Sequence, residues 1–392
     1  MTTTINNEHK KLNVPNLRFP EFSGEWKEYE LGDICEAITD FVAAGSFASL
    51  RENVKYYQED NYAQLVRTVD LKNDFTNNDF VYVDEIAYDF LWRVQLKEPN
   101  IVLPNIGANI GEKYYVSPKD LPKDKNVLGP NAILLRSKCN DTHFVYFRLS
   151  TSSYDNEMKK LVGASGQPKF NKTDLKKVKL FMPLLKEQKK ISYFLALLEE
   201  RIATQTKIID KLQTLIKGIA QNIACNNRPN IRISECLECS SSTLQESDVC
   251  EHGTYPVYGA NGIVGYLDNY NTEGEAIYII KDGSGVGTVS YVTGKCSATG
   301  TLNTLQTKKG YSLQYLYYML KVFSFDSYKT GMAIPHIYFK DYGKAKIFCP
   351  SYTEQLQYAR LLSAIDSKLS AEYIFLTNLS LQKQYLLRQM FI

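Results

Sequence analysis

Apolar residues recur every three or four positions from Pro183 to Asn226, with Gln205 as the one polar residue in the series. This spacing predicts a single long helix with a heptad seam. At about 1.5 Å per residue the helix would be roughly 60 Å long, more than the height of an ordinary domain, so we expect a spacer. Its seam positions include Leu195, Leu198, Ile202, Ile209, Leu212 and Ile216.

The same pattern returns 167 residues later, between Pro350 and the C-terminus. Glu372 interrupts it where Gln205 interrupts the first copy, and Lys383 stands opposite Ile216. Residues outside the seam match too, because Glu187-Gln188 aligns with Glu354-Gln355. We infer a tandem duplication. The second seam includes Leu362, Ile365, Leu369, Leu376, Leu379 and Leu386.

Short apolar runs bounded by Gly, Pro and Asn predict a mixed α/β domain before each long helix. In the first copy we expect strands within 61–69, 100–104, 113–117 and 131–136, and one helical segment over 142–162. In the second we expect strands within 275–281, 288–292 and 301–306, and a helix over 312–323. The fold class is therefore α+β with an internal repeat. The expected segments are an arm at 1–24, domains at 25–183 and 227–350, and long helices within 184–226 and 351–392.

The net charge of +3 gives no clear indication of a nucleic-acid partner, but local charge is more informative. Seven lysines and one acid lie between Lys159 and Lys179, and four lysines and one acid lie between Lys329 and Lys346. Both clusters precede a long helix. No apolar run approaches membrane-spanning length, so we expect no membrane segment. The N-terminus has no apolar signal region and the eight cysteines are scattered, which predicts reduced thiols in a cytoplasmic protein.

Patterns typical of catalysis or cofactor binding are weak. Cys236-x-x-Cys239 has no second closely spaced ligand pair, which argues against zinc. The G-x-G-x-G after Tyr278 resembles a nucleotide loop, but the β-branched Thr288-Val289 that follows predicts a hairpin where such a loop needs a helix. No P-loop is present and the four histidines are isolated. We predict no catalytic residue, metal or cofactor in this chain.

Loops rich in Gly, Pro, Lys, Asn and Tyr occur in both copies, with Gly107 and Gly111 aligned on Gly283 and Gly287. Glycine permits close backbone approach to a ligand, lysine contacts phosphate, and Arg, Asn and Gln pair with base edges. Taken singly, each loop fits an ordinary surface turn better than a DNA contact. Because the Lys-rich loop recurs before both long helices, the two interpretations stay equally open. The candidate DNA contacts are Arg51, Lys55, Tyr57, Arg67, Asn105, Asn109, Lys113, Gln167, Lys169, Asn171, Tyr258, Asn261, Lys281, Ser284, His336 and Lys340.

The chain resembles the specificity subunits of type I restriction–modification systems. The segments that carry the resemblance are the Leu31-Gly-Asp-Ile34 opening, the Arg18–Trp26 leader, Tyr258–Tyr266, Gly283–Gly287, Gly166–Asn171 and Pro183-x4-Gln188. The second copy departs from this pattern, with Ile334-Pro-His-Ile337 in place of Gly-Gln-Pro-Lys.

The resemblance implies two target-recognition domains, each reading half of a split double-stranded DNA site. It implies that the long helices pair antiparallel, and that the seam residues named above serve as spacer and as the docking region for two methyltransferase subunits. Restriction (translocase-nuclease) subunits would join outside. S-adenosylmethionine, ATP and Mg²⁺ would serve these partners, and this chain would be non-catalytic.

Three other readings stay open on the residues alone. A coiled-coil scaffold without a DNA role would bind DNA neither tightly nor in a salt-dependent way. A single-chain adenine methyltransferase would need a cofactor loop and an amine-holding motif, which the sequence lacks. An RNA-binding adaptor would carry an aromatic ribonucleoprotein motif, which is also missing.

Overall fold

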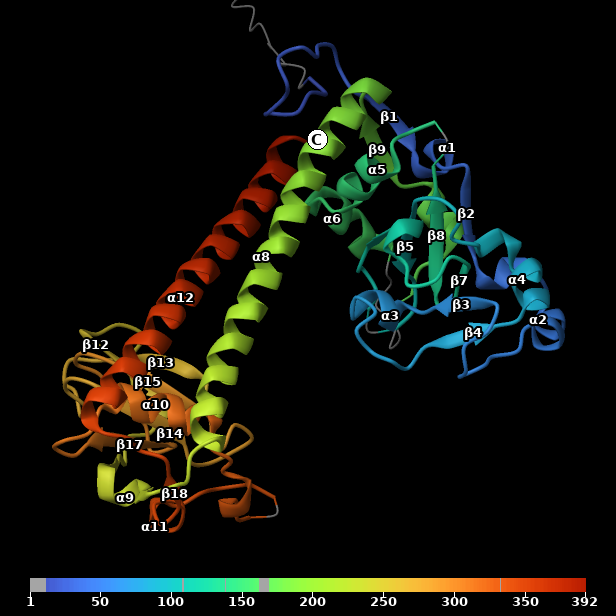
Figure 1. The fold of residues 1–392 in the computed structure, drawn as a ribbon. Coiled ribbons are helices and arrows are strands. Elements are labelled where there is room, and N and C mark those ends of the chain that lie inside the picture. The colour runs from blue at the N-terminus through green and yellow to red at the C-terminus, as the bar shows by residue number, and fades with distance from the viewer. Residues whose placement is uncertain (1–11, 108, 138, 162–168, 332) are drawn as a thin grey trace, which may run out of the picture. The chain divides into compact units, whose positions relative to one another are not determined.

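The computed structural model describes residues 12–107, 109–137, 139–161, 169–331 and 333–392. The chain divides into two compact units, one made of the residues up to Ala203 together with Thr377–Ile392, the other of Thr204–Leu376. Each unit holds one mixed α/β domain and a part of both long helices, α8 (Leu185–Cys225) and α12 (Tyr352–Gln389) (Figure 1). The α+β class with two long helices is therefore confirmed.

The domain of the first unit precedes α8. Its strands are β1 (Lys27–Glu30), β2 (Ala37–Asp40), β3 (Ala63–Val66), β4 (Val81–Val83), β5 (Asn100–Pro104), β6 (Tyr114–Val116), β7 (Asn126–Leu128), β8 (Ala132–Arg136) and β9 (Lys179–Met182). Its α-helices are α1 (Leu31–Ile34), α2 (Phe47–Asn53), α3 (Thr68–Lys72), α4 (Glu85–Phe90), α5 (Thr142–Leu149), α6 (Ser152–Leu161) and α7 (Lys172–Lys176). Short 3-10 helices are η1 (Phe41–Ala44), η2 (Trp92–Val94) and η3 (Pro118–Asp120).

The domain of the second unit lies between α8 and α12. Its strands are β10 (Ile231–Arg232), β11 (Leu237–Ser241), β12 (Tyr255–Gly259), β13 (Gly262–Leu267), β14 (Ala276–Ile280), β15 (Val289–Val292), β16 (Ser297–Ala298), β17 (Leu302–Thr307) and β18 (Lys346–Ile347). Its helices are α9 (Ile233–Cys236), α10 (Leu313–Val322) and α11 (Phe339–Tyr342), with 3-10 helices η4 (Glu246–Asp248) and η5 (Asp326–Tyr328).

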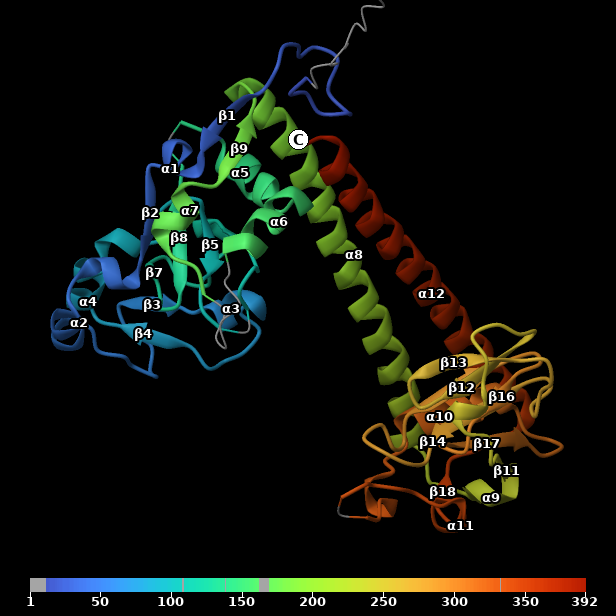
Figure 2. The ribbon, with the colours of Figure 1, turned by 180° about the vertical axis from the view of Figure 1, so that it is seen from behind.

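The two domains have the same sheet topology. The order β2-β8-β5-β6 of the first matches β11-β17-β14-β15 of the second, and all pairings in both are antiparallel. The order β4-β3-β7 matches β13-β12-β16, each with one antiparallel and one parallel pairing (Figure 2). The ribbon β1-β9 matches β10-β18. The internal repeat therefore extends through both domains.

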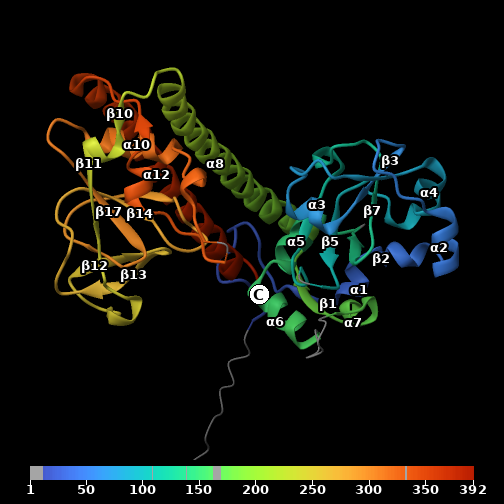
Figure 3. The ribbon, with the colours of Figure 1, turned by 90° about the horizontal axis from the view of Figure 1, so that it is seen from below.

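The central strands of each four-stranded sheet are buried on both faces, which explains their nearly continuous apolar sequences. In β5, Ile101 and Leu103 join a core with Phe144 of α5, while Val102 joins a core with Leu65 of the three-stranded sheet. Figure 3 shows α5 lying beside β5. The second domain repeats the arrangement, since Ile277 and Ile279 of β14 face the core that α10 covers, and Tyr278 faces the opposite core. Alternation along a strand thus builds two cores from one sheet.

The helical segment expected over 142–162 is wrong as one helix, because it breaks between α5 and α6. Ser150 Oγ donates to the carbonyl of Tyr146 at 2.9 Å, and Thr151 Oγ1 accepts from the amide of Tyr154 at 3.4 Å. Hydroxyl groups that bond nearby backbone compete with the helical pattern and favour helix ends. The chain therefore stops one helix and starts another here.

A buried glutamine at the start of each long helix joins it to its domain. Gln188 accepts from the amide of Asp141, which caps α5, at 3.0 Å and donates to the carbonyl of Pro183 at 2.9 Å. Gln355 makes the same pair of bonds, from the amide of Ser312, which caps α10, and to the carbonyl of Pro350, both at 2.9 Å. Both side chains are 2 % exposed. Each amide therefore satisfies backbone groups of two elements that are far apart in sequence.

The two long helices pack along the predicted seam within each unit. In the first unit, Leu195 near the start of α8 shares a core with Leu386 near the end of α12. In the second, Ile216 near the end of α8 shares a core with Leu362 near the start of α12. The start of one helix thus meets the end of the other, which confirms antiparallel pairing.

Polar residues interrupt the seam and find partners across it. The side chain of Gln205 donates to the carboxylate of Glu372, its own repeat equivalent, and to the Glu372 carbonyl at 3.3 Å. Lys383 forms an ion pair with Glu199 at 2.5 Å in the first unit. Partly buried polar pairs of this kind cost some desolvation but fix which residues face one another.

No helix in the described part of the chain combines the length and the apolar character that a bilayer crossing requires.

Replacing Gln355 with Leu tests the connection between α12 and the domain that precedes it. We expect the free energy of unfolding to fall by about 2–4 kcal/mol, because the amide of Ser312 and the carbonyl of Pro350 would stay buried without a partner. Urea denaturation of the full chain measures the change. Gln357→Leu is the matched control, since Gln357 lies on the same helix with an exposed side chain, and it should change the free energy little. Equal effects of the two substitutions would contradict the role of Gln355.

Candidate nucleic-acid interface

A glycine-containing loop and the segment before the long helix come together in the first unit. The loop after β5 pairs with the chain at Lys169, where Ile106 and Lys169 form an isolated antiparallel bridge. The amide of Phe170 donates to the carbonyl of Asn105 at 3.4 Å. Asn105 and Lys169, separated by more than sixty residues, therefore lie side by side. Gln167 and the rest of 162–168 lie outside the described residues.

The second unit repeats this pairing with different side chains. Asp282 and His336 form the corresponding bridge, and the amide of Ile337 donates to the carbonyl of Lys281 at 2.9 Å. The amide of Gly283 also donates to the carbonyl of Pro335 at 2.9 Å. Lys281, Ser284 and His336 therefore belong to one cluster. We call these two sites the paired loops of the first unit (105–113 with 169–171) and of the second (281–287 with 334–340).

The glycines of the paired loops take backbone conformations that other residues seldom adopt. Gly107 and Gly111 have φ of +91° and +92°, and their equivalents Gly283 and Gly287 have φ of +96° and +92°. A side chain in this region is strained, so glycine is required by the turn itself. Between β14 and β15 the glycines close a hairpin, and no helix follows them. The hairpin predicted after Tyr278 is therefore confirmed.

Side-chain contacts hold the paired loop of the first unit against α3 and α6. Lys72 of α3 donates to Asn109 Oδ1 at 2.9 Å and pairs with Glu112 at 2.7 Å. Lys113 pairs with Asp155 of α6 at 2.6 Å, with its Nζ 5.6 Å from the ring of Tyr154. Asn109 and Lys113 are thus partly committed to internal bonds. Lys169 and Asn171 are exposed, but Asn171 also caps α7, where it accepts from the amide of Asp174 at 2.8 Å. Asn105 keeps a buried Oδ1 without a hydrogen-bond partner among the described residues.

Other candidates of the first unit lie on α2, on α3 or beside β4. Arg51 and Lys55 are exposed, and among the described residues no hydrogen bond or ion pair joins them to the paired loop. Tyr57 donates to Asp84 at 3.1 Å, and this hydrogen bond is the main cause that raises the pKa of Tyr57. Arg67 at the start of α3 pairs with Asp70 at 2.8 Å, which raises the pKa of Arg67. Tyr57 and Arg67 therefore have structural partners in this state.

The remaining candidates of the second unit flank its paired loops. Tyr258 lies in β12, and its ring packs edge-on against the ring of Tyr278, with the two ring centroids 5.7 Å apart. Burial raises the pKa of Tyr258. Asn261 is exposed between β12 and β13. Lys340 of α11 is exposed, with its Nζ 5.0 Å from the ring of Tyr338.

Some exposed aromatic and apolar side chains were not among the candidates taken from the sequence. Ile334 and Tyr338 flank His336 and are 66 % and 46 % exposed. In the first unit, Trp92 is 60 % exposed, and the guanidinium of Arg93 lies 4.6 Å from its ring. Tyr338 follows a proline loop in the sequence, which was a usable indication, whereas nothing local marks Trp92 as exposed.

The seam residues proposed for the spacer are mostly turned inward. Leu195, Ile209, Ile216, Leu362, Leu369, Leu379 and Leu386 are buried, and Leu198, Ile202, Leu212, Ile365 and Leu376 are partly buried. They hold the helices and domains together, so a partner protein would meet other residues first. Apolar side chains that do face outward include Tyr193, Leu381 and Tyr385 in the first unit, and Leu215, Leu361 and Ile374 in the second.

Among the residues that the structure describes, no three His, Cys, Asp or Glu side chains gather as ligands. Cys236 is buried in α9, where burial raises the pKa of its thiol to about 12, and Cys239 lies in β11. A thiol with a raised pKa is a poor ligand, because metals bind the thiolate.

The chain is thus a duplication of one building unit, a mixed α/β domain with paired loops that is joined to one long helix. A family model described as the type I restriction modification DNA specificity domain matches residues 23–214 and again residues 230–374. The chain belongs to this family, whose general role is the recognition of DNA targets.

Individual relatives agree with the family. The EcoprrI type I restriction enzyme specificity subunit of Escherichia coli is 27% identical over 113 residues, 29% of this chain and 28% of that protein. A putative type I restriction enzyme MjaX specificity subunit of Methanocaldococcus jannaschii is 26% identical over 222 residues, 55% of this chain and 49% of that protein. The chain thus matches half or less of the length of these relatives.

The fold is also found among solved structures. The type I restriction-modification S subunit from M. genitalium superposes with a TM-score of 0.66 at 17% identity, covering 97% of this chain and 99% of that one. At this identity the match establishes the fold of the chain.

Proposed function

We propose that this chain reads a bipartite DNA target, with one domain on each half, and directs partner subunits of a type I restriction–modification system to it. The observation that carries the proposal is the duplication of the paired loops inside two domains that both match a DNA specificity model. The backbone pairing is shared and the side chains differ, as expected of two readers of different sequences.

In this proposal the paired loops enter the grooves of the duplex. Exposed Lys169 and Lys340 contact phosphates, which positions the protein without reading sequence. Asn105, Asn109, Gln167, Asn171 and Asn261 have side chains that can pair with base edges. So do Arg51 and, after it exchanges its present partner Asp70, Arg67. Tyr57, Tyr258, Lys281, Ser284, His336, Lys55 and Lys113 complete the proposed contact set.

The long helices set the distance between the halves and carry the partner subunits. Two methyltransferase subunits dock on them, and the outward apolar residues Tyr193, Leu215, Leu361 and Leu381 supply exposed contact area. Restriction subunits join outside these. Methylation of adenine and cleavage belong to the partners, which use S-adenosylmethionine, ATP and Mg²⁺, and this chain supplies recognition alone.

Single-molecule sequencing of DNA from cells that carry this chain with its methyltransferase partner tests the proposal. We expect methylated adenines within one split motif, two short defined blocks around an unspecified gap of fixed length. A cell with the partner and a different specificity chain is the control, and must give a different motif. If the partner is active in the control yet this chain adds no methylation, the DNA-directing function is wrong.

Lengthening the helix pair tests its role as a spacer. Seven residues inserted after Gln205 in α8 and seven after Ala371 in α12, at the level where Gln205 meets Glu372, keep the facing residues of both seams together and lengthen the pair by about 10 Å. We expect a longer gap in the methylated motif with unchanged half-site bases. Altered bases at an unchanged gap would show that the helices do not set the distance.

Removing two exposed lysines tests the phosphate contacts. The double variant Lys169→Gln, Lys340→Gln should bind a target duplex more weakly, and the slope of log affinity against log salt should become shallower by about 2, one unit per lost phosphate contact. Fluorescence anisotropy over a range of salt concentrations gives the slope. Lys207→Gln with Lys211→Gln on the exposed side of α8 is the charge-matched control. A scaffold without a DNA role would show no such slope in either protein.

A further inference from the structure

Backbone bonds on both sides fix His336 in the paired loops of the second unit. Its amide donates to the carbonyl of Thr330 at 2.8 Å, and the amide of Thr330 donates back to the carbonyl of His336 at 2.9 Å. On its other side His336 bridges to Asp282, in the loop after β14. Two neighbouring segments therefore set the position of this residue, which leaves only its side chain to be oriented.

Three contacts orient the imidazole ring. Nδ1 lies 3.2 Å from the carbonyl oxygen of Ile334, and the ring of Tyr338 packs edge-on, with the two ring centroids 5.1 Å apart. The third contact is Gly331, which has a φ of +90°. A Cβ atom at Gly331 would lie 2.9 Å from Cε1 of the ring and would overlap the Ile334 carbonyl. Glycine at this position thus leaves the space that the ring occupies.

The contact to Ile334 decides which ring nitrogen carries a proton. A carbonyl oxygen only accepts hydrogen bonds, so Nδ1 is the donor. In the neutral ring, Nε2 is then left with a lone pair and acts as an acceptor. Nε2 has no hydrogen-bond partner among the described residues, and the side chain is partly exposed. The second domain therefore presents an oriented acceptor in its paired loops.

The segments that pair with His336 or continue from it carry charges of both signs. They are Lys281, Asp282, Lys329 and Lys340, in addition to Asp326 of η5. Asp326 pairs with Lys329 at 2.7 Å. Among the described residues, no carboxylate forms an ion pair with His336. The ring thus has no internal counter-charge, and a bound partner decides how Nε2 is used.

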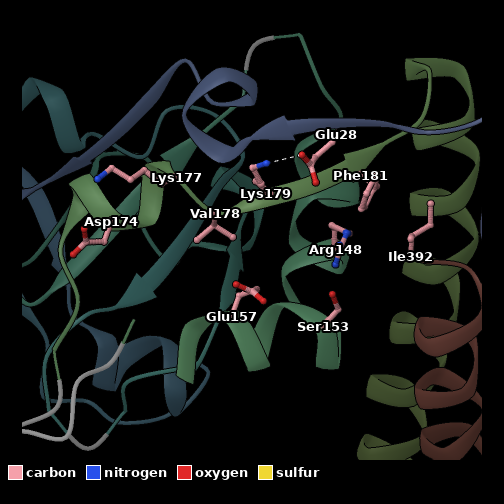
Figure 4. A pocket seen from close by; sticks show the side chains of 10 residues that line it. All are labelled: Glu28, Arg148, Ser153, Glu157, Asp174, Lys177, Val178, Lys179, Phe181 and Ile392. Carbon is pink, nitrogen blue, oxygen red and sulfur yellow. Dashed lines mark hydrogen bonds and ion pairs between the residues drawn. The ribbon is translucent and has the colours of Figure 1, made fainter. Parts of the chain in front are cut away.

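A cavity of about 420 Å³ in the first unit shows the contrast. Its lining holds three carboxylates beside three cations, namely Glu28, Glu157, Asp174, Arg148, Lys177 and Lys179. Glu28 pairs with Lys179 at 2.8 Å, and Figure 4 shows Lys177 and Arg148 on opposite sides. The polar groups of this cavity do not converge on one ligand, whereas the contacts of His336 aim a single nitrogen atom.

We propose that Nε2 of His336 accepts a hydrogen bond from the exocyclic amino group of an adenine or a cytosine in the second half-site. This inference rests on the proposed function, because it gives one residue of the paired loops its role on the duplex. The amino groups of adenine and cytosine are donors on the major-groove edge. A phosphate does not suit a neutral acceptor, since phosphate oxygens accept as well. The equivalent residue of the first unit, Lys169, is a cation and suits a phosphate.

Discrimination at the second half-site should depend on pH. The full chain with its methyltransferase partner is titrated with the duplex that methylation mapping identifies, and with duplexes altered in one half-site. As the pH falls from about 8 to about 5.5, Nε2 gains a proton and becomes a donor that faces a donor, so discrimination at the second half-site should fall about tenfold. Discrimination at the first half-site is the control and should stay constant. Constant discrimination at both half-sites, with tighter binding of every duplex at low pH as a phosphate contact predicts, would overturn the proposal.

Substitutions at His336 and Gly331 separate the acceptor from its support. His336→Ala should lower discrimination at the second half-site about tenfold at pH 8 and remove the pH dependence. His336→Gln keeps an acceptor that does not titrate, so it should retain more discrimination than His336→Ala and lose the pH dependence. Gly331→Ala should act like His336→Ala, because its methyl group displaces the ring. Gly310→Ala is the matched control, with a φ of +94° and open space around it, and equal effects of the two glycine substitutions would contradict the role of the ring.

Duplexes that lack one exocyclic amino group in the second half-site locate the base. One of them should bind the wild-type complex about tenfold more weakly, and should bind the His336→Ala complex without further loss. Additive losses at every position would contradict the assigned contact. If the wild-type complex discriminates at neither half-site, the proposed function itself fails. If it discriminates at both and the His336 variants leave this unchanged, the inference on His336 alone fails.

Discussion

The two buried glutamines at the starts of α8 and α12 are the constraint on which the rest of the chain depends. A long helix that emerges from a domain must satisfy the backbone at its own start and at the domain surface it leaves. Gln188 and Gln355 do both, each by accepting from the cap of the neighbouring helix and donating to the preceding proline carbonyl. Because the same bonds occur in both copies, each domain is fixed to its helix in one orientation.

The glutamate that precedes each of these two glutamines makes different contacts in the two copies. Glu187 binds Arg18 through two bonds of 2.7 Å and so ties the N-terminal arm to α8. Glu354 instead accepts from the amide and hydroxyl of Ser351 at the start of α12. Sequence matching pairs the two glutamates, yet only the glutamines share a function. Two residues at aligned positions of the repeat therefore need not have the same role, because their contacts can differ.

Much of the frame could be predicted from the sequence, because it follows from periodicity. The spacing of three and four between apolar residues predicted both long helices. Gln205 and Glu372, which interrupt that spacing in the two copies, contact one another. The hairpin after Tyr278 followed from the β-branched residues that come next. The break at Ser150-Thr151 was missed, since apolar spacing carries on across it and only hydroxyl bonds to backbone reveal it.

The site was harder to predict, because it depends on pairings between distant segments. Each loop was identifiable as a candidate, but the bridge from Ile106 to Lys169 joins segments that sequence spacing does not relate. The burial of individual side chains was equally hard to predict from the sequence. Arg148 reads as an ordinary polar position on a helix, and Arg67 as an ordinary exposed base, until their contacts are known.

The two copies differ mainly in side chains that their shared backbone pairing does not use. The paired loops keep their backbone bonds and their four glycine conformations, while Asn105 becomes Lys281 and Lys169 becomes His336. The first domain also carries α2, α3 and α4 between strands that follow one another more closely in the second. A protein that only held two partners apart would gain nothing from preserving the loop pairing while changing its surface chemistry. A fixed backbone with exchangeable side chains is what reading two different half-sites demands, because base readout needs a positioned backbone and sequence-dependent groups upon it.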